Sequence, residues 1–423
     1  MWETLNQIFR VPSLRNKILF ILGLLVIYRL AANIPLPGVD VLALKKLFEE
    51  NAFLGLLNVF SGGGLSNISI VLLGVAPYIT ASIIMQLLTT LVPSLERMYK
   101  EEGEQGRQKF NMITRWLTVP LAGLQSFSML SLLKSQGILG EIAPFTLAVI
   151  VLSATAGTIF LMWLGELITE KGLGNGVSLI IFAGIVSSLP TMISRFIATW
   201  DPSQFFVYVL FLLVAAVTIA GVILVNEGQR TIPVAYAKRI RGGSTIGGSS
   251  THLPLKVNQA GVIPIIFAVS LILIPTMLAN FLVNSSNAKV AEAAVTLSGW
   301  LQNQLIYGLI YFILVVVFTY FYTAVVFDPN KISENLQKQG GYIPGIRPGK
   351  TTAEYLYHIM NRITLAGALF LGLIAVLPFV VQGLTGISSL SLGGVSILIV
   401  VSVVLETIKQ IQSQMTMRSY ENL

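Results

Sequence analysis

FSGGGLSNISIVLLGVAPYITASIIMQLLTTLV, residues 60–92, is the stretch that decides the fold. Its C-terminal part is apolar enough to lie in lipid, but its first ten residues, 60–69, hold three glycines, three serines and an asparagine. Irregular polar backbone is tolerated at membrane depth only where protein buries it or where it lines a water-filled cavity. We therefore expect this segment to face an internal channel, with a short mobile piece that leads into a broken helix.

The composition is that of a polytopic membrane protein. Of the 423 residues, 54% are apolar and only 11% are charged, and the mean hydropathy is +0.78, whereas soluble domains carry about 25% charged residues. The absence of cysteine excludes disulfides and thiolate metal sites, and the two histidines, His252 and His358, lie too far apart in sequence to suggest a metal centre. The first residues lack the basic region and cleavage site of a signal peptide, so we expect the first apolar run to remain as a transmembrane helix.

Ten apolar runs are long enough to cross a bilayer, for which a helix needs about 20 residues. They lie at residues 18–34, 68–92, 116–133, 144–167, 177–193, 205–226, 261–283, 305–327, 363–381 and 392–408. If the N-terminus is cytoplasmic, 21 of the 27 lysines and arginines fall on the cytoplasmic side, as the positive-inside rule requires. The outer side then keeps only Arg29, Lys45, Lys46, Lys134, Arg195 and Lys289. We therefore predict that both termini are cytoplasmic.

The ten helices divide at the loop around Arg195–Ser203 into an N-terminal half, residues 1–195, and a C-terminal half, residues 196–423. An odd number of helices per half forces the second half to run in the opposite sense across the membrane. In such inverted repeats, Gly/Pro-interrupted segments at matching positions mark the functional site. GVAP at Gly74–Pro77 recurs as GVIP at Gly261–Pro264, in the second and seventh runs. The predicted fold is thus all-α, with two inverted five-helix halves around a central pore.

Two predicted cytoplasmic loops, residues 228–259 and 328–362, are longer than simple turns. The first contains alternating runs at Thr231–Ala237 and Thr251–Val257 around a Gly/Ser-rich tip, which predicts a β-hairpin arm. The second contains a turn-rich stretch that presents Arg347. Basic loops often only set topology and touch anionic lipid, but the length and structure of these two favour protein docking as well.

No catalytic constellation stands out in the sequence. The nearest approach to a phosphate-binding loop, Gly345–Thr351, has one residue too few between its glycines, and Pro348 removes a backbone N–H that such a loop needs. We therefore expect no enzymatic activity, no cofactor and no metal site.

The sequence also argues against two other classes of membrane protein, ion-coupled transporters and purely structural scaffolds. Ion-coupled transporters carry ionisable residues inside their helices, whereas the middles of the ten runs lack Asp, Glu, Lys and Arg. A pore closed by apolar side chains fits better, because a hydrophobic constriction gates by excluding water. The polar Gly/Ser segment in turn argues against a purely structural scaffold.

Four motifs resemble those of one family. FSGGGLSNISIVLLGVAPYITASIIMQLL, GLGNGVSLIIFAGIV, STHLPLKVNQAGVIPIIFA and GYIPGIRPGKTTAEYL look like the SecY family of protein translocase channel subunits, which is homologous to Sec61 alpha of eukaryotes. The resemblance covers essentially the whole chain. It implies a channel that passes unfolded polypeptides across the membrane and releases hydrophobic segments laterally into lipid.

The resemblance also assigns roles to particular residues. It implies a plug within residues 60–69, formed by Phe60, Ser61, Gly62, Gly63, Gly64, Leu65, Ser66 and Asn67. It implies a pore ring of Val75, Ile79, Val177, Ile181, Ile266 and Ile399, in which the two valines depart from an isoleucine-rich pattern. It implies a lateral gate lined by Ser82, Gln86, Thr89, Ser270, Ile274 and Pro275. It implies docking of SecA and the ribosome at Arg230, Lys238, Arg239, Arg241, Arg347, Lys350 and Tyr420.

The spacing of the ring residues supports their assignment independently. Val75 and Ile79, and likewise Val177 and Ile181, are four residues apart and so share one face of a helix. Asn175, between two glycines, is instead predicted to cap the fifth helix and is a structural residue.

The resemblance implies partners that would supply the driving force for translocation. The chain contains no energy-transducing motif, so the driving force would come from the motor ATPase SecA or from the translating ribosome. SecE would clamp the back of the two halves and SecG would sit beside the first. Signal peptides, nascent polypeptides and membrane lipids are the other expected partners, without direct DNA binding. The expected location is the bacterial cytoplasmic membrane, although a thylakoid version is an alternative.

Overall fold

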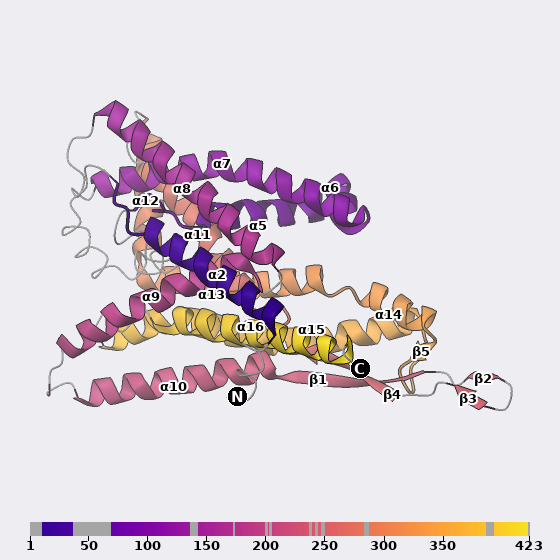
Figure 1. Ribbon diagram of the computed structural model, residues 1–423. Helices are drawn as coiled ribbons and strands as arrows, with labels where there is room; N and C mark the ends of the chain where they lie inside the picture. Colours follow the sequence, from indigo (N-terminus) through magenta and orange to yellow (C-terminus); the bar gives the residue numbers. More distant parts are fainter. Residues whose placement is uncertain are drawn as a thin grey trace.

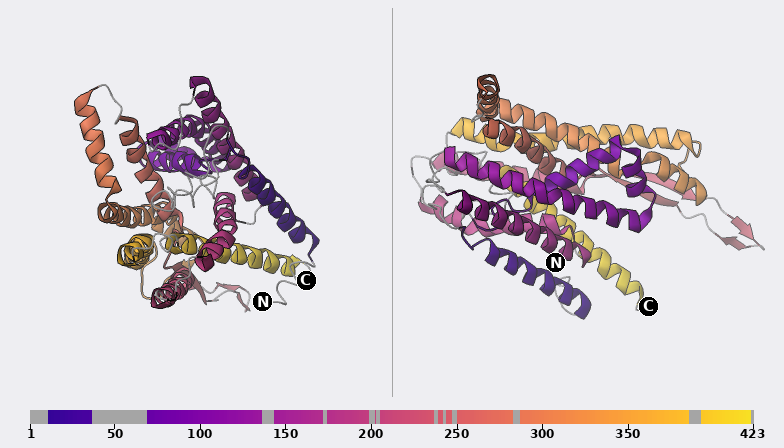
Figure 2. Two further views of the ribbon diagram at one scale, coloured as in Figure 1. Left: turned by 90° about the vertical axis from the view of Figure 1, so that its left-hand side faces the viewer. Right: turned by 90° about the horizontal axis from the view of Figure 1, so that it is seen from above.

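The computed structural model describes residues 11–36, 69–135, 143–171, 174–198, 202, 205–236, 239–241, 244–246, 250–282, 287–385 and 393–421. Long helices run side by side in a bundle, and a small β-sheet projects from one end (Figure 1). Two further views show the same bundle from its other end and from above (Figure 2). The predicted plug falls outside the described residues except for its last residue, Ser69.

Each of the ten predicted apolar runs falls mainly on its own helix, and among the described residues three further helices, α6, α12 and α14, connect them. The helices are α2 (Pro12–Ala31), α5 (Ala76–Leu91), α6 (Pro93–Lys100), α7 (Gly103–Ser135), α8 (Pro144–Glu170), α9 (Gly176–Ala198), α10 (Phe205–Glu227), α11 (Ile263–Leu282), α12 (Ala288–Gln302), α13 (Gln304–Val326), α14 (Pro329–Lys338), α15 (Lys350–Thr385) and α16 (Gly393–Glu421).

Helix length and composition alone identify fewer spans than the sequence predicts. Within the described residues, five helices are long and apolar enough to cross a membrane, in α8, α10, α13, α15 and α16. The pair α5 and α6 could supply a sixth, but it is bent by 109° at Val92. Val92 is extended because it precedes Pro93, and the proline ring disfavours helical backbone in the residue before it. The count of ten spans therefore stays a prediction.

The predicted hairpin arm is confirmed, and it carries an additional strand. The strands are β1 (Gln229–Tyr236), β2 (Arg239–Arg241), β3 (Ser244–Ile246), β4 (Ser250–Lys256) and β5 (Gly341–Tyr342). β1 pairs antiparallel with β4, from Gln229 opposite Lys256 to Ala235 opposite Ser250. β5 pairs with the other edge of β1 and so joins the second loop to the first. The two cytoplasmic loops of the prediction thus form one structure.

The repeated GVxP motif has the same backbone geometry at both of its positions. Gly74 precedes α5 with φ +57°, and Gly261 precedes α11 with φ +63°. This left-handed conformation favours glycine, which has no Cβ to clash. The prolines Pro77 and Pro264 follow in the first turn of each helix, where a missing N–H costs no hydrogen bond. The two segments therefore enter their helices in the same way, as repeat partners would.

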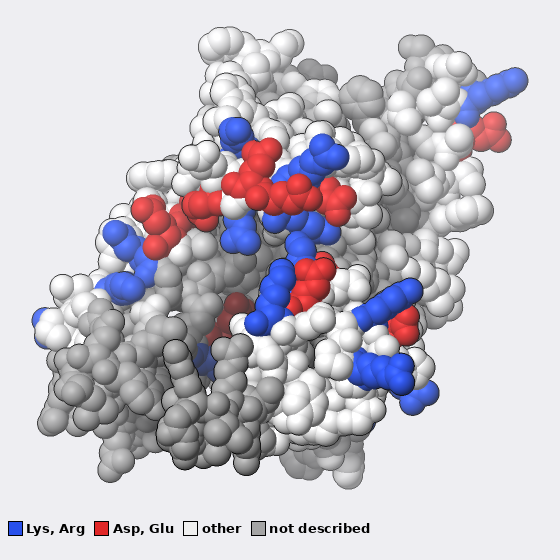
Figure 3. Space-filling model, turned by 90° about the vertical axis from the view of Figure 1, so that its right-hand side faces the viewer, with Lys and Arg blue, Asp and Glu red and all other residues white. Residues whose placement is uncertain are grey.

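Charged side chains gather at the end of the bundle that carries the sheet (Figure 3). The ion pairs Lys100–Glu96, Arg115–Glu166, Lys338–Glu334 and Lys409–Glu227 involve basic residues that the sequence predicts on the cytoplasmic side. The start of α2 and the end of α16 lie toward this same end (Figure 1). These positions agree with the predicted orientation of the chain.

Glycines allow α8 and α9 to approach closely where α9 begins. A Cβ at Gly176 would overlap the carbonyl oxygen of Gly165, and it would lie 2.9 Å from the Cβ of Ile168. The approach is reinforced by a hydrogen bond, since the Gly176 N–H donates to Thr169 Oγ1 over 2.9 Å. Small residues at helix interfaces permit this kind of backbone contact in membranes.

We expect Gly176→Ala to destabilise the protein by about 1–3 kcal/mol, because overpacking forces the two helices apart. The measurement is thermal unfolding of the purified chain in detergent. Gly23→Ala is the matched control, since Gly23 lies in α2 with no atom near its virtual Cβ. Equal melting temperatures for the two variants would contradict the proposed contact.

Candidate pore, gate and docking surface

The six predicted ring residues all belong to the large apolar core of the bundle, to which α2, α7, α8, α10, α13 and α15 contribute as well. Five of them lie in four helices that are distant in sequence, α5, α9, α11 and α16, and Val75 is the residue directly before α5. Val75, Ile79, Ile181, Ile266 and Ile399 are each at most 7% exposed, and the half-buried Val177 packs against them. The structure therefore brings these side chains into one core. Their action as a pore ring stays a prediction.

Local structure at the start of α9 positions two of these residues. The Asn175 side-chain oxygen accepts a hydrogen bond from the Ser178 N–H over 3.2 Å, which confirms the predicted helix cap. Since α9 begins directly after this cap, Val177 lies in its first turn and Ile181 one turn later. The cap thus fixes where the aliphatic face of α9 starts.

The predicted gate residues lie on two helices that pack against each other, α5 and α11. Thr89 and Ser270 are buried, whereas Ser82, Gln86, Ile274 and Pro275 are half-buried. Thr89 Oγ1 donates to the Gln86 carbonyl oxygen over 2.6 Å, within α5. On the other side of α5, Gln125 of α7 reaches Thr80 Oγ1 over 3.4 Å. A side-chain hydrogen bond thus ties α5 to α7, on the side of the N-terminal half.

A polar network that sequence reasoning missed holds the start of α11. Asn226 of α10 donates to Ser402 Oγ of α16 over 2.7 Å, and Asn258 donates to the Asn226 side-chain oxygen over 2.8 Å. Asn258 Nδ2 also lies 3.1 Å from the Gly261 carbonyl oxygen. Because this network is mostly removed from water, its members support one another. It anchors the left-handed turn before α11, the helix of Ile266, to α10 and α16. In the sequence, the polar residues at the end of α10 were the one signal that could have indicated this network.

Arg347 is exposed on a turn whose backbone is held on several sides. Thr352 Oγ1 donates to the Arg347 carbonyl oxygen over 2.8 Å, and Ser333 Oγ of α14 donates to the Gly349 carbonyl oxygen over 2.6 Å. Ile343 is buried in a small cluster beneath β1 and β4, and its strand neighbour Tyr342 pairs with β1. The turn therefore presents Arg347 in a fixed place.

The other predicted docking residues are described to different extents. Arg230 is exposed on β1, and Lys350 is exposed at the start of α15. For Arg239 and Arg241 only the strand backbone is described, and for Tyr420 only its place in α16. Lys238 lies outside the described residues. The predicted positions that are described thus lie at the end of the bundle with the sheet.

Among the described residues, no group of His, Cys, Asp and Glu side chains could hold a metal ion. The centre of the bundle contains apolar side chains and isolated hydroxyl and amide groups. An apolar centre of this kind can separate two aqueous spaces.

The fold and this centre define a helical membrane protein whose aliphatic core is built from both the N-terminal and the C-terminal parts of the sequence. A family model described as SecY matches residues 69–408. Protein translocase subunit SecY of Thermotoga maritima is 44% identical over 435 residues, which span 100% of this chain and 97% of that protein. The same subunit of Corynebacterium glutamicum is 44% identical, over 99% of this chain and 98% of that protein. The chain belongs to the SecY family, as its motifs predict.

Solved structures share the fold at lower sequence identity. One, described as a protein-conducting channel, aligns with a TM-score of 0.64 at 18% identity, over 93% of this chain and 90% of that one. Another, Sec61 in a canine ribosome-channel complex from the endoplasmic reticulum, aligns with a TM-score of 0.61 at 16% identity, over 93% and 90%. The overall arrangement of helices is therefore that of SecY and Sec61 channels.

Proposed function

We propose that the chain is a protein-conducting channel, which passes unfolded polypeptides across the cytoplasmic membrane and releases hydrophobic segments sideways into lipid. The observation that carries the proposal is that α5, α9, α11 and α16 all place aliphatic ring residues in the shared apolar core of the bundle. Branched aliphatic side chains exclude water and ions where they meet. Each contact is nevertheless weak enough to part around a moving chain. The names of the curated relatives, protein translocase subunits, support the same function.

In this proposal ten helices cross the membrane, five in residues 1–195 and five, inverted, in residues 196–423. The matching turns at Gly74 and Gly261 support the repeat relation. The polypeptide path lies between the halves, sealed by the ring and, from outside, by a plug at residues 60–69. The gate lies between α5 and α11, which are neighbours in the bundle. Hydrophobic segments leave between these two helices.

The partners follow from the same proposal. SecA or the translating ribosome docks on the end that carries the sheet and the Arg347 turn, since both termini and most positive charge lie on the cytoplasmic side. The structural relatives include channels in complexes with ribosomes, which supports docking of a ribosome. SecE clamps the halves and SecG lies beside the first. The location is the bacterial cytoplasmic membrane.

A disulfide cross-link tests whether a polypeptide passes through the aliphatic cluster. The chain lacks cysteine, so Ile79→Cys introduces a single thiol. A translocation substrate with one cysteine is stalled part-way through reconstituted vesicles. We expect a cross-link at residue 79 only when SecA and ATP are present, because only then does the chain enter the pore.

Leu309→Cys is the matched control, since Leu309 lies on α13 with 63% of its side chain exposed on the outside of the bundle. We expect no cross-link there. Continued export without any cross-link at residue 79 would overturn the assigned path.

A further inference from the structure

α12 occupies the end of the bundle opposite the sheet. The sheet connects α10 to α11, and α14 connects α13 to α15, so α12, which connects α11 to α13, lies at the other end. Its 15 residues make a helix about 22 Å long, whereas a span needs about 20 residues. α12 runs across the direction of the long helices (Figures 1 and 2). It is therefore placed as a helix that lies along the membrane surface.

One side of α12 packs on the protein and another is uncovered. Ala294 is 3% exposed, and Val290, Ala291 and Ser298 are half-buried on the same side. The uncovered side carries a shallow depression lined by Lys289, Glu292, Ala293, Thr296, Leu297 and Trp300. The exposed fractions of Leu297 and Trp300 are 39% and 61%. Two large apolar side chains on this side of α12 are thus partly open to the surroundings, and Val295, at 56% exposed, is a third on another face.

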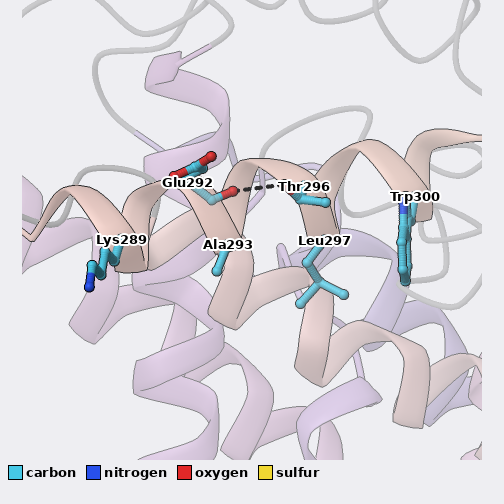
Figure 4. Close-up of a pocket in the computed structure, with 6 residues that line it drawn as sticks. All are labelled: Lys289, Glu292, Ala293, Thr296, Leu297 and Trp300. Atoms are coloured by element: carbon cyan, nitrogen blue, oxygen red, sulfur yellow. Dashed lines mark hydrogen bonds between the residues drawn. The ribbon is translucent and has the colours of Figure 1, made fainter.

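Four residues of the uncovered side form a stripe along α12, which we call the α12 stripe: Lys289, Ala293, Leu297 and Trp300. Their spacing of three and four residues places them on one face, and their side chains point to the same side of the helix, while Glu292 points away (Figure 4). The stripe has a cation at its first turn, a tryptophan at its last turn and apolar carbons between them. This is the pattern of a helix that lies in a lipid headgroup region.

The orientation of the stripe is fixed relative to a helix that faces lipid. A single residue, Asn303, separates α12 from α13, and its side-chain oxygen accepts from the Leu305 and Ile306 N–H groups at 3.1 and 3.4 Å. Leu305 is 85% exposed and begins a run of exposed apolar side chains at four-residue spacing on α13. The run is Leu305, Leu309, Ile313 and Val317. The α12 stripe therefore ends at Trp300, five residues before the exposed apolar run of α13 begins at Leu305.

We propose that the α12 stripe binds the lipid headgroup region on the side of the membrane opposite the sheet, and so anchors the corner between α11 and α13. Trp300 lies at headgroup level, as aromatic side chains do at membrane boundaries. Leu297 and Ala293 face the upper acyl chains, and the Lys289 ammonium reaches lipid phosphates along its flexible stem. The inference requires that α13 crosses the membrane and does not depend on translocation activity. Its consequence is mechanical, because α11, which carries Ile266 and the predicted gate residues Ser270, Ile274 and Pro275, is held to the bilayer at its outer end.

Spin labels on single introduced cysteines test the proposal in the full chain, assembled with its partner subunits in vesicles of phosphatidylethanolamine and phosphatidylglycerol. Ala293→Cys and Leu297→Cys report the stripe, and Glu292→Cys reports the polar edge of the same uncovered side, where the side chain points away from the stripe (Figure 4). Collision with oxygen reports lipid, and collision with a water-soluble nickel chelate reports water. We expect the oxygen-to-nickel ratio to be roughly threefold or more higher at residues 293 and 297 than at 292, because the apolar face of an interfacial helix sits about 5–10 Å into the headgroup boundary.

Two results at the stripe would overturn the proposal. Nickel access at residues 293 and 297 equal to that at 292 would place the stripe in water, and exclusion of both reagents would place a protein on it. Leu309→Cys gives the reference for lipid on α13. Water-like access at residue 309 would overturn the spanning role of α13, and the proposal with it, whereas a failure of translocation alone would leave these accessibilities unchanged.

Discussion

Replacing Ile79 and Ile266 together with glycine is expected to make the resting channel leak ions while translocation continues. These two side chains come from opposite halves of the chain, lie on the neighbouring helices α5 and α11, and are both buried in the apolar core. We expect resting conductance to rise on the order of tenfold, because a hydrophobic constriction excludes water only while its apolar side chains meet. The measurement is the current across planar bilayers that contain the purified complex without substrate.

Glycine also weakens helices by about 1 kcal/mol each, so a matched control is needed to separate leak from loss of structure. The double variant Leu309→Gly/Ile313→Gly places the same changes on the exposed face of α13, away from the cluster. We expect it to conduct like the parent channel. A double variant at 79 and 266 that stays as tight as the parent would show that these residues do not form the seal.

Much of the fold can be predicted from local patterns of the sequence. The ten apolar runs each coincide with a helix, and the alternation in Thr231–Ala237 and Thr251–Val257 predicts the hairpin, because both patterns follow the period of their own element. Asn175 caps α9 as expected, since a cap needs only a side-chain oxygen and the next turn of backbone. The GVxP repeat marks two matching positions in the sequence, and the structure adds that both glycines adopt the same left-handed conformation.

Other features depend on contacts between residues far apart in the sequence, which local patterns cannot predict. β5 has only two residues, too few to show an alternation, and it forms because α14 and the following turn carry it to the edge of β1. The hydrogen bond from Asn226 to Ser402 joins residues 176 positions apart. The alanine-rich α12 has too little apolar character to be recognised as a membrane element. Its exposed apolar face can be identified only from the structure, in which the opposite face packs on the protein.

The ring itself shows the limit of sequence reasoning most clearly. Val75, Ile79 and Ile181 are ordinary apolar residues in apolar helices, and such residues usually only pack. Their spacing predicts shared faces within α5 and within α9, but not that these faces meet. Only the resemblance to SecY selected them, and only the three-dimensional structure places them in one cluster with Ile266 and Ile399.

Arg347→Glu is expected to abolish SecA-driven translocation while the complex still assembles. Arg347 is exposed, and its carbonyl oxygen, together with that of Gly349, is hydrogen-bonded to α14 and α15, so the guanidinium starts from a fixed backbone position. A preorganised Arg can bind carboxylates in bidentate fashion at little cost in entropy. Reversal of its charge replaces that attraction with repulsion. We expect loss of at least tenfold in protected substrate, on the order of the 2–5 kcal/mol lost when one partner of a buried charge pair is truncated.

Two further variants separate docking from a general change of charge. Lys331→Glu reverses an exposed charge on the neighbouring α14 and is expected to translocate normally, because an acidic residue near the start of a helix is favoured by the helix dipole. Arg347→Lys keeps the charge but loses the planar fork, so we expect partial activity. Substrate protected from protease in vesicles is the readout, and ribosome-driven insertion of a membrane protein is measured in parallel. Normal export by Arg347→Glu would refute the docking role of the turn. Equal losses in Arg347→Glu and Lys331→Glu would instead assign the effect to the net charge of this end of the protein.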